Sequence, residues 1–187
     1  MNYDDVIRKA RDMRALFMQE HYGAKIPWAV NVQKFGRVVS EKTGWQVVSR
    51  VLPIPDSLRG ALIRMPDHQA LILINDKNNE CWKRFTFLKE VSHLFLEDEG
   101  QFITDTEQLA SSLVDMEMDS DGYSLREAAG ILAAIEIGIP EAIKSAIFHA
   151  INVDGLTPYQ IAYRLKMPQK YVEYRLRQWG IMPDSGE

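Results

Sequence analysis

The run from Phe85 to Leu96 constrains this chain more than any other segment, because seven of its twelve positions are large and apolar and only three are ionisable. A helix of that composition has no broad polar face, so it must be buried on most sides. Its only ionisable side chains are Lys89, Glu90 and His93. Burying charge without partners is costly, so we expect these side chains to face a cavity or one another. Lys89 and His93 lie one helical turn apart and share a face.

The rest of the chain predicts an α+β fold in which helices dominate. Strand-like runs cover 45–52, 58–65 and 69–74, and the last two are separated by a turn and expected to pair as a hairpin. We therefore expect a small, mainly antiparallel sheet of about three strands. Helical spacing of apolar residues predicts helices over 3–22, 31–42, 80–97, 104–118, 124–138, 141–152, 158–166 and 169–179.

Composition limits the class of protein. The chain has 187 residues, 46% of them hydrophobic, which suits one compact core with a small appended helical unit. No apolar run is long enough to cross a membrane, and the N-terminal segment lacks the apolar core of a secretory signal. A single cysteine, Cys81, fits a reducing compartment and is read as a packing residue rather than a nucleophile. We expect a full-length cytoplasmic protein that has no membrane partner.

The buried helix contains most of a zinc-peptidase motif. H-E-x-x-H places two histidines one turn apart on the same ion, while the Glu reaches the metal-bound water as general base. Here Glu90, Val91, Ser92 and His93 follow Lys89, which stands where the first histidine belongs. E-x-x-H alone is a weak signal. A buried Lys89–Glu90 charge cluster beside a hydrogen-bonded His93 explains it equally well.

Longer stretches of sequence carry a resemblance to a known family. The run from Gly60 through LILIND, then RFTFLKEVSHLFL, and later EAAGILAAIEIGIP resemble the ImmA/IrrE family of zinc-dependent metallo-endopeptidases, bacterial and phage proteins that act on or beside transcriptional repressors. The departures from the family pattern are Lys89 for the first ligand histidine, Ser92 for a glycine and Gly130 for an alanine. The resemblance covers about 27–180.

The resemblance implies a zincin-like minimal metallopeptidase fold and assigns roles to particular residues. Glu90 falls on the general base, His93 and Glu127 fall on metal ligands, and Lys89 falls on the position of the first ligand histidine. Lys89 and Glu90 are therefore the candidate catalytic-site residues. Glu107 is a rival third ligand. The metallopeptidase-like domain then spans 1–152 and includes an acidic insertion at about 97–121, and 153–187 forms a C-terminal helical cap. A protein partner, such as a transcriptional repressor, is also implied.

Lysine at a ligand position changes the expected chemistry. Removing its proton at pH 7 costs roughly 4.6 kcal/mol, and an ammonium about 4 Å from a divalent ion is repelled by roughly 8 kcal/mol at an effective dielectric of 20. We therefore expect no cofactor, with zinc disfavoured, and a pseudo-peptidase in which Lys89 pairs with Glu90 and Glu127. An active zinc endopeptidase that cleaves a repressor is the alternative. It requires either a neutral Lys89 or a substitute ligand such as His68.

The C-terminal segment offers a different function. Residues 157–180 have the form of two short helices joined by a tight turn, which resembles a helix-turn-helix. Lys166, Lys170, Arg175 and Arg177 are then candidates for contacts with DNA phosphates. The chain as a whole is acidic, with a net charge of −4, and a helical cap packed on the fold explains the same pattern.

Overall fold

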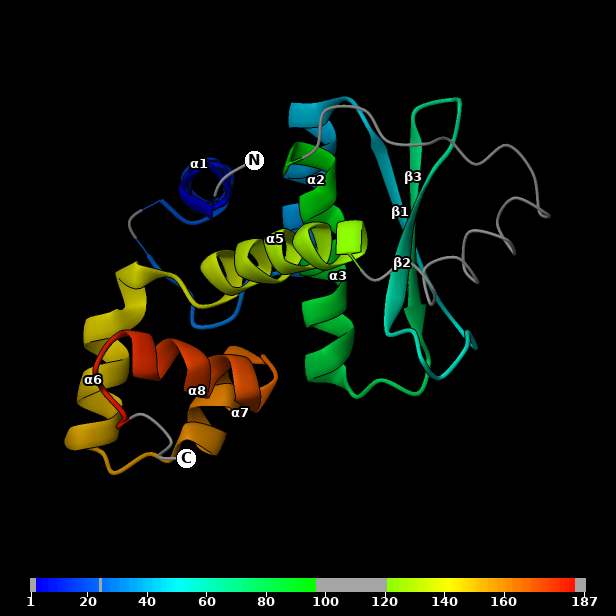
Figure 1. Ribbon diagram of the computed structural model, residues 1–187. Helices are drawn as coiled ribbons and strands as arrows, with labels where there is room; N and C mark the ends of the chain where they lie inside the picture. The colour runs from blue at the N-terminus through cyan, green and yellow to red at the C-terminus, as the bar shows by residue number, and fades with distance from the viewer. Residues whose placement is uncertain (1–2, 24, 97–120, 184–187) are drawn as a thin grey trace.

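The computed structural model describes residues 3–23, 25–96 and 121–183 (Figure 1). It confirms an α+β fold in which helices dominate and a small sheet has three strands. The predicted helix over 104–118, the acidic insertion and Glu107 lie outside the described residues. The elements are α1 (Tyr3–His21), α2 (Val32–Thr43), β1 (Gln46–Leu52), β2 (Gly60–Arg64), β3 (Gln69–Asn75), α3 (Glu80–Leu96), α5 (Asp121–Gly138), η1 (Glu141–Ile143), α6 (Lys144–Asn152), α7 (Pro158–Leu165) and α8 (Gln169–Gln178).

The sheet has the order β1-β3-β2 and is mixed. The expected hairpin is present, since β2 and β3 pair antiparallel with Leu62 opposite Ile72. The other pair, β1 with β3, is parallel, and Val48 lies opposite Leu71. The strand β3 is therefore central and is hydrogen-bonded on both sides. Its position explains its nearly continuous apolar sequence, because a central strand in a covered sheet has little solvent contact.

The helix α3 occupies the middle of the molecule, as its apolar sequence predicted. It packs against β2 and β3 on one side and against α1, α2 and α5 elsewhere. Figure 1 shows α5 crossing α3 and extending away from the sheet. Leu88, Val91 and Leu94 are among its buried residues. Lys89 and His93 of α3 consequently lie next to α5.

Local signals in the sequence set several helix ends. The side chain of Asn31 accepts a hydrogen bond from the backbone N–H of Lys34 at the start of α2. The same helix ends at Gly44, whose φ of +78° is readily adopted only by glycine. At the start of α7, Thr157 and Gln160 form a reciprocal capping box.

The helices α6, α7 and α8 form a small group at one end of the molecule, shown in yellow to red in Figure 1. α7 and α8 pack directly against each other. Buried Ile161, Leu165 and Leu176 supply apolar contacts within this group. Of the helices in the described ranges, none combines the length and the apolar character needed to cross a membrane.

Candidate functional site

The structure brings Lys89 and Glu90 of α3 together with Glu127 of α5. Nζ of Lys89 lies 2.5 Å from Oε2 of Glu127 and 3.0 Å from Oε1 of Glu90. The first contact has hydrogen-bond geometry, and the second is an ion pair. One ammonium therefore lies between two carboxylates that come from different helices.

Burial makes this cluster electrostatically strong. The side chains of Lys89, Glu90 and Glu127 are only 13%, 5% and 24% exposed. Burial lowers the pKa of Lys89, but the charges of Glu90 and Glu127 and their short contacts with the ammonium more than offset this effect. The pKa of Lys89 therefore lies above its ordinary value, and the side chain keeps its proton at neutral pH.

His93 lies one turn further along α3, against the backbone of α5. A Cβ atom on Gly130 would lie only 2.7 Å from Nε2 of His93 and 3.1 Å from Cγ of Lys89. A glycine is thus needed here for α5 to approach α3 so closely. The backbone carbonyl of His93 accepts a hydrogen bond of 2.9 Å from Nη2 of Arg64. His93 is 6% exposed, so its ring is held in a tightly packed place.

Ser92, which also departs from the family pattern, lies in the core. It is completely buried, and its hydroxyl donates a hydrogen bond of 2.6 Å to the carbonyl of Leu88. The polar group is satisfied inside the helix, so the serine does not alter the charges at the site.

The residues at this site do not fit a zinc ion. A protonated lysine carries three donors and no lone pair, so it cannot be a ligand. Its ammonium also occupies the space between Glu90 and Glu127, where a cation held by these carboxylates would lie. Within residues 3–23, 25–96 and 121–183, no group of three or more His, Cys, Asp or Glu side chains is placed to hold a metal ion.

A cleft of about 230 Å³ leads to the ion-pair cluster. Its walls come from the loop before β2, the first half of α3, α5 and the start of α8, and both Lys89 and Glu127 line it. Glu90 and His93 are not among its lining residues, and they are 3% and 6% exposed. A molecule in the cleft therefore meets the lysine and Glu127 rather than the expected general base.

The outer part of the cleft has an aromatic wall that sequence reasoning missed. Phe85 and Tyr171 stack with ring centroids 4.1 Å apart, and Trp82 packs edge-on to both. The guanidinium of Arg59 lies 3.7 Å from the centroid of the Trp82 ring, and Nζ of Lys170 lies 4.9 Å from it. Phe85 belongs to the family-like segment and Lys170 to the C-terminal helices, but neither pattern indicates that these side chains meet, because the segments are far apart in the sequence.

His68, a possible substitute ligand, and Cys81, a possible nucleophile, have surroundings that suit structural roles. His68 occupies the turn between β2 and β3 with a φ of +58°, and its ring packs on Trp45 at 5.2 Å. Cys81 is partly buried in the first turn of α3, and burial raises the pKa of its thiol. A raised pKa disfavours the reactive thiolate, which agrees with a packing role.

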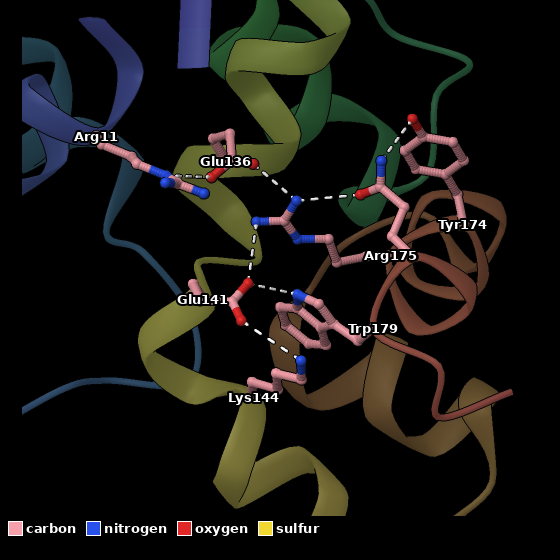
Figure 2. Close-up of polar contacts among 8 residues, drawn as sticks. Arg11, Glu136, Glu141, Lys144, Tyr174, Arg175 and Trp179 are labelled. Carbon is pink, nitrogen blue, oxygen red and sulfur yellow. Dashed lines mark hydrogen bonds and ion pairs between the residues drawn. The ribbon is translucent and has the colours of Figure 1, made fainter. Parts of the chain in front are cut away.

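The four candidate DNA-binding cations of the C-terminal helices differ in how exposed they are. Arg175 is only 5% exposed, and its Nη1 lies 2.7 Å from Oε1 of Glu136 (Figure 2). Lys170 lines the cleft, and Arg177 lines a second cleft of about 470 Å³ beside it. Lys166 ends α7 and is exposed. The guanidinium of Arg175 is therefore committed to the interior and is not available to a phosphate.

Residues that carry the family resemblance have visible structural roles. Arg84 donates a hydrogen bond to the carbonyl of Val30. At the end of β3, Nδ2 of Asn75 donates to the carbonyl of Leu58 at 2.9 Å, which ties down the loop before β2. A Cβ on Gly60 would lie 2.3 Å from Cγ2 of Thr86, so β2 approaches α3 closely. These contacts hold the sheet edge and α3 in place around the cleft.

Comparison with protein-family models and with curated proteins finds no significant match to this chain. The likeness to the ImmA/IrrE family therefore rests on the quoted residues, and the function it implies remains a proposal.

Proposed function

We propose that this chain is an ImmA/IrrE-like pseudo-peptidase. It acts in the cytoplasm as a regulator, through contact with another protein, in a bacterial or phage or mobile-element transcriptional pathway. One observation carries the proposal: the ammonium of Lys89 lies between the carboxylates of Glu90 and Glu127. In the related peptidases that position belongs to the metal site.

The ion pairs support a loss of hydrolysis. Lysine contributes a single positive charge and has no lone pair and no open coordination position. It therefore cannot lower the pKa of a bound water or polarise a scissile carbonyl as a zinc ion does. Glu90 faces the ammonium and is buried, so it is not free to act as general base on a water in the cleft.

The same ion pairs support retention of the fold. An ammonium keeps Glu90 and Glu127 charged and paired where a metal ion would otherwise do so. The peptidase-like cleft then persists as a surface on which another protein can dock, and a regulator needs binding rather than turnover.

Metal content of the purified full chain tests the proposal. We expect far less than one zinc per chain after dialysis against zinc-containing buffer, and no change on His93→Ala or Glu127→Gln. Stoichiometric zinc that is lost in both variants would overturn the proposal and favour the active endopeptidase.

The Lys89→His variant sharpens the same experiment. It restores H-E-x-x-H beside Glu127, so we expect zinc content to rise toward one ion per chain. The His68→Ala substitution in that background is the matched control and should leave the content unchanged. If Lys89→His binds no more zinc than the parent chain, lysine is not what excludes the ion.

A further inference from the structure

Two cations share one aromatic ring at the outer part of the cleft. The guanidinium carbon of Arg59 and Nζ of Lys170 lie 3.7 and 4.9 Å from the centroid of the Trp82 ring. Their separation cannot exceed the sum of these two distances. Lys170 also lies 4.6 Å from the centroid of the Tyr171 ring. The two charges are therefore held close together against an aromatic wall.

Neither cation has a carboxylate partner among the residues that the structure describes. Arg59 donates one hydrogen bond, from Nη1 to Oδ1 of Asn78 at 3.3 Å. Asn78 is itself buried and donates to the backbone carbonyl of Arg59 at 2.8 Å, so the side chain is fixed in place. A guanidinium has five N–H donors, and most of those on Arg59 remain available. Two close, like charges repel, and an anion between them would relieve that repulsion.

A carboxylate at the inner end of the same cleft limits how much negative charge a ligand can carry. Glu127 lines it, and its carboxylate already pairs with Lys89. A phosphate group carries about −1.5 to −2 charges and would be repelled more strongly by Glu127 than a carboxylate would. The cleft volume of about 230 Å³ is also below the roughly 300–1,000 Å³ of pockets that hold drug-sized ligands. It suits one or two side chains rather than a whole nucleotide.

We propose that Arg59, Lys170 and Trp82 form a receptor for a carboxylate side chain, through which the cleft binds an acidic peptide segment of a partner protein. The carboxylate accepts charge-assisted hydrogen bonds from the guanidinium and the ammonium. The aliphatic part of the acidic side chain packs on the indole. This inference rests on the proposed function, because it takes the partner to be a protein, and it names the chemistry that the partner must present.

Nuclear magnetic resonance of the ¹⁵N-labelled full chain tests the assignment. The indole N–H signal of Trp82 is assigned with Trp82→Phe and followed while a short glutamate-rich peptide is added at constant ionic strength. The isosteric glutamine-rich peptide and inorganic phosphate are added in parallel. We expect a saturable shift with the glutamate peptide, and at least about tenfold weaker binding of the glutamine peptide and of phosphate.

Three variants complete the test. Arg59→Gln and Lys170→Gln should each weaken binding of the glutamate peptide at least about tenfold. Arg50→Gln removes an exposed arginine of β1 that lies outside the cleft and should leave it unchanged. Equal shifts with the glutamate and glutamine peptides, tighter binding of phosphate, or an equal effect of Arg50→Gln would overturn the assignment. Metal content is measured without any peptide, so a failed titration of metal-free protein overturns the receptor while the pseudo-peptidase proposal stands.

Discussion

At the scale of single residues, Lys89 shows how burial determines the contribution of an ion pair to stability. Among the described residues, two lysines make similarly short contacts with carboxylates, at 2.5 Å for Lys89 with Glu127 and 2.6 Å for Lys77 with Asp56. The side chains of Lys77 and Asp56 are 67% and 72% exposed, so water and salt screen their interaction. Lys89 and Glu90 are largely removed from water. Loss of the Lys89 ammonium therefore leaves a buried carboxylate without its partner.

Two lysine-to-methionine substitutions test whether the buried ion pair contributes more to stability than the exposed one. Lys89→Met should lower the free energy of unfolding by about 3 kcal/mol, at the lower end of the range for broken buried pairs because Glu127 is partly exposed. Lys77→Met should leave stability unchanged within error. Urea unfolding at neutral pH measures both. Equal losses in the two variants, or a more stable Lys89→Met protein, would contradict the ion-pair account.

At the scale of elements, the close approach of α3 and α5 creates the site. Glu127 comes from α5, and it reaches Lys89 only because Gly130 lets the two helix backbones come close together. Glycine inside a helix is normally unfavourable relative to alanine by about 1 kcal/mol. Here that cost is accepted at a position where a methyl group would collide with His93.

The substitution Gly130→Ala separates helix propensity from packing. We expect it to destabilise the protein by about 1–3 kcal/mol, the usual range for an overpacked core, although alanine favours the isolated helix. Thermal or urea unfolding of the variant gives the value. In the His93→Ala background the imidazole is absent, so Gly130→Ala should become neutral or stabilising there. A stabilising effect in the parent chain would show that α5 lies farther from His93 than described.

The pairing of strands shows what sequence patterns can and cannot determine at this scale. The hairpin of β2 and β3 is predictable because a short turn joins two apolar runs, and β2 lies opposite β3 as expected. The parallel pairing of β1 with β3 is not predictable in this way, since periodicity records which face is buried but not which strand is the neighbour. The sequence does indicate that β3 is central, because β3 carries apolar residues on both faces.

At the scale of the whole molecule, a polar network around the buried Glu136 joins the C-terminal helices to the rest of the fold. Glu136 of α5 is 1% exposed and pairs with Arg11 of α1 at 3.2 Å and with Arg175 of α8 at 2.7 Å (Figure 2). Nε1 of Trp179 donates a hydrogen bond of 2.6 Å to Glu141 in the same network. The C-terminal helices are thereby fixed to α5, and Lys170 is positioned over the cleft.

Long-range contacts of this kind explain where sequence reasoning was incomplete. The spacing around Arg175 resembles that of a DNA-binding helix. The sequence does not show that Arg175 is buried and paired with Glu136, because Glu136 belongs to α5, far from α8 in the sequence. The wall made by Arg59, Trp82 and Lys170 is not predictable either, because the sequence offers Lys170 only as a contact for DNA phosphates and nothing in it places Lys170 beside Trp82. Lys89, Glu90 and His93 could be singled out because they are the only ionisable side chains in the mostly apolar stretch 85–96.

The protonation state of Lys89 tests the central claim most directly. Its folded-state pKa is raised, so the ion pair is complete below the unfolded-state value of roughly 10.4 and is lost only as the pH rises through the folded-state pKa. The side-chain Cε signal, assigned with Lys89→Arg, can be followed by nuclear magnetic resonance from pH 7 upward, with and without zinc. We predict no titration up to a pH of about 10 and no response to zinc. A midpoint below roughly 10.4, or deprotonation on addition of zinc, would contradict the claim that an ammonium stands in the place of the metal.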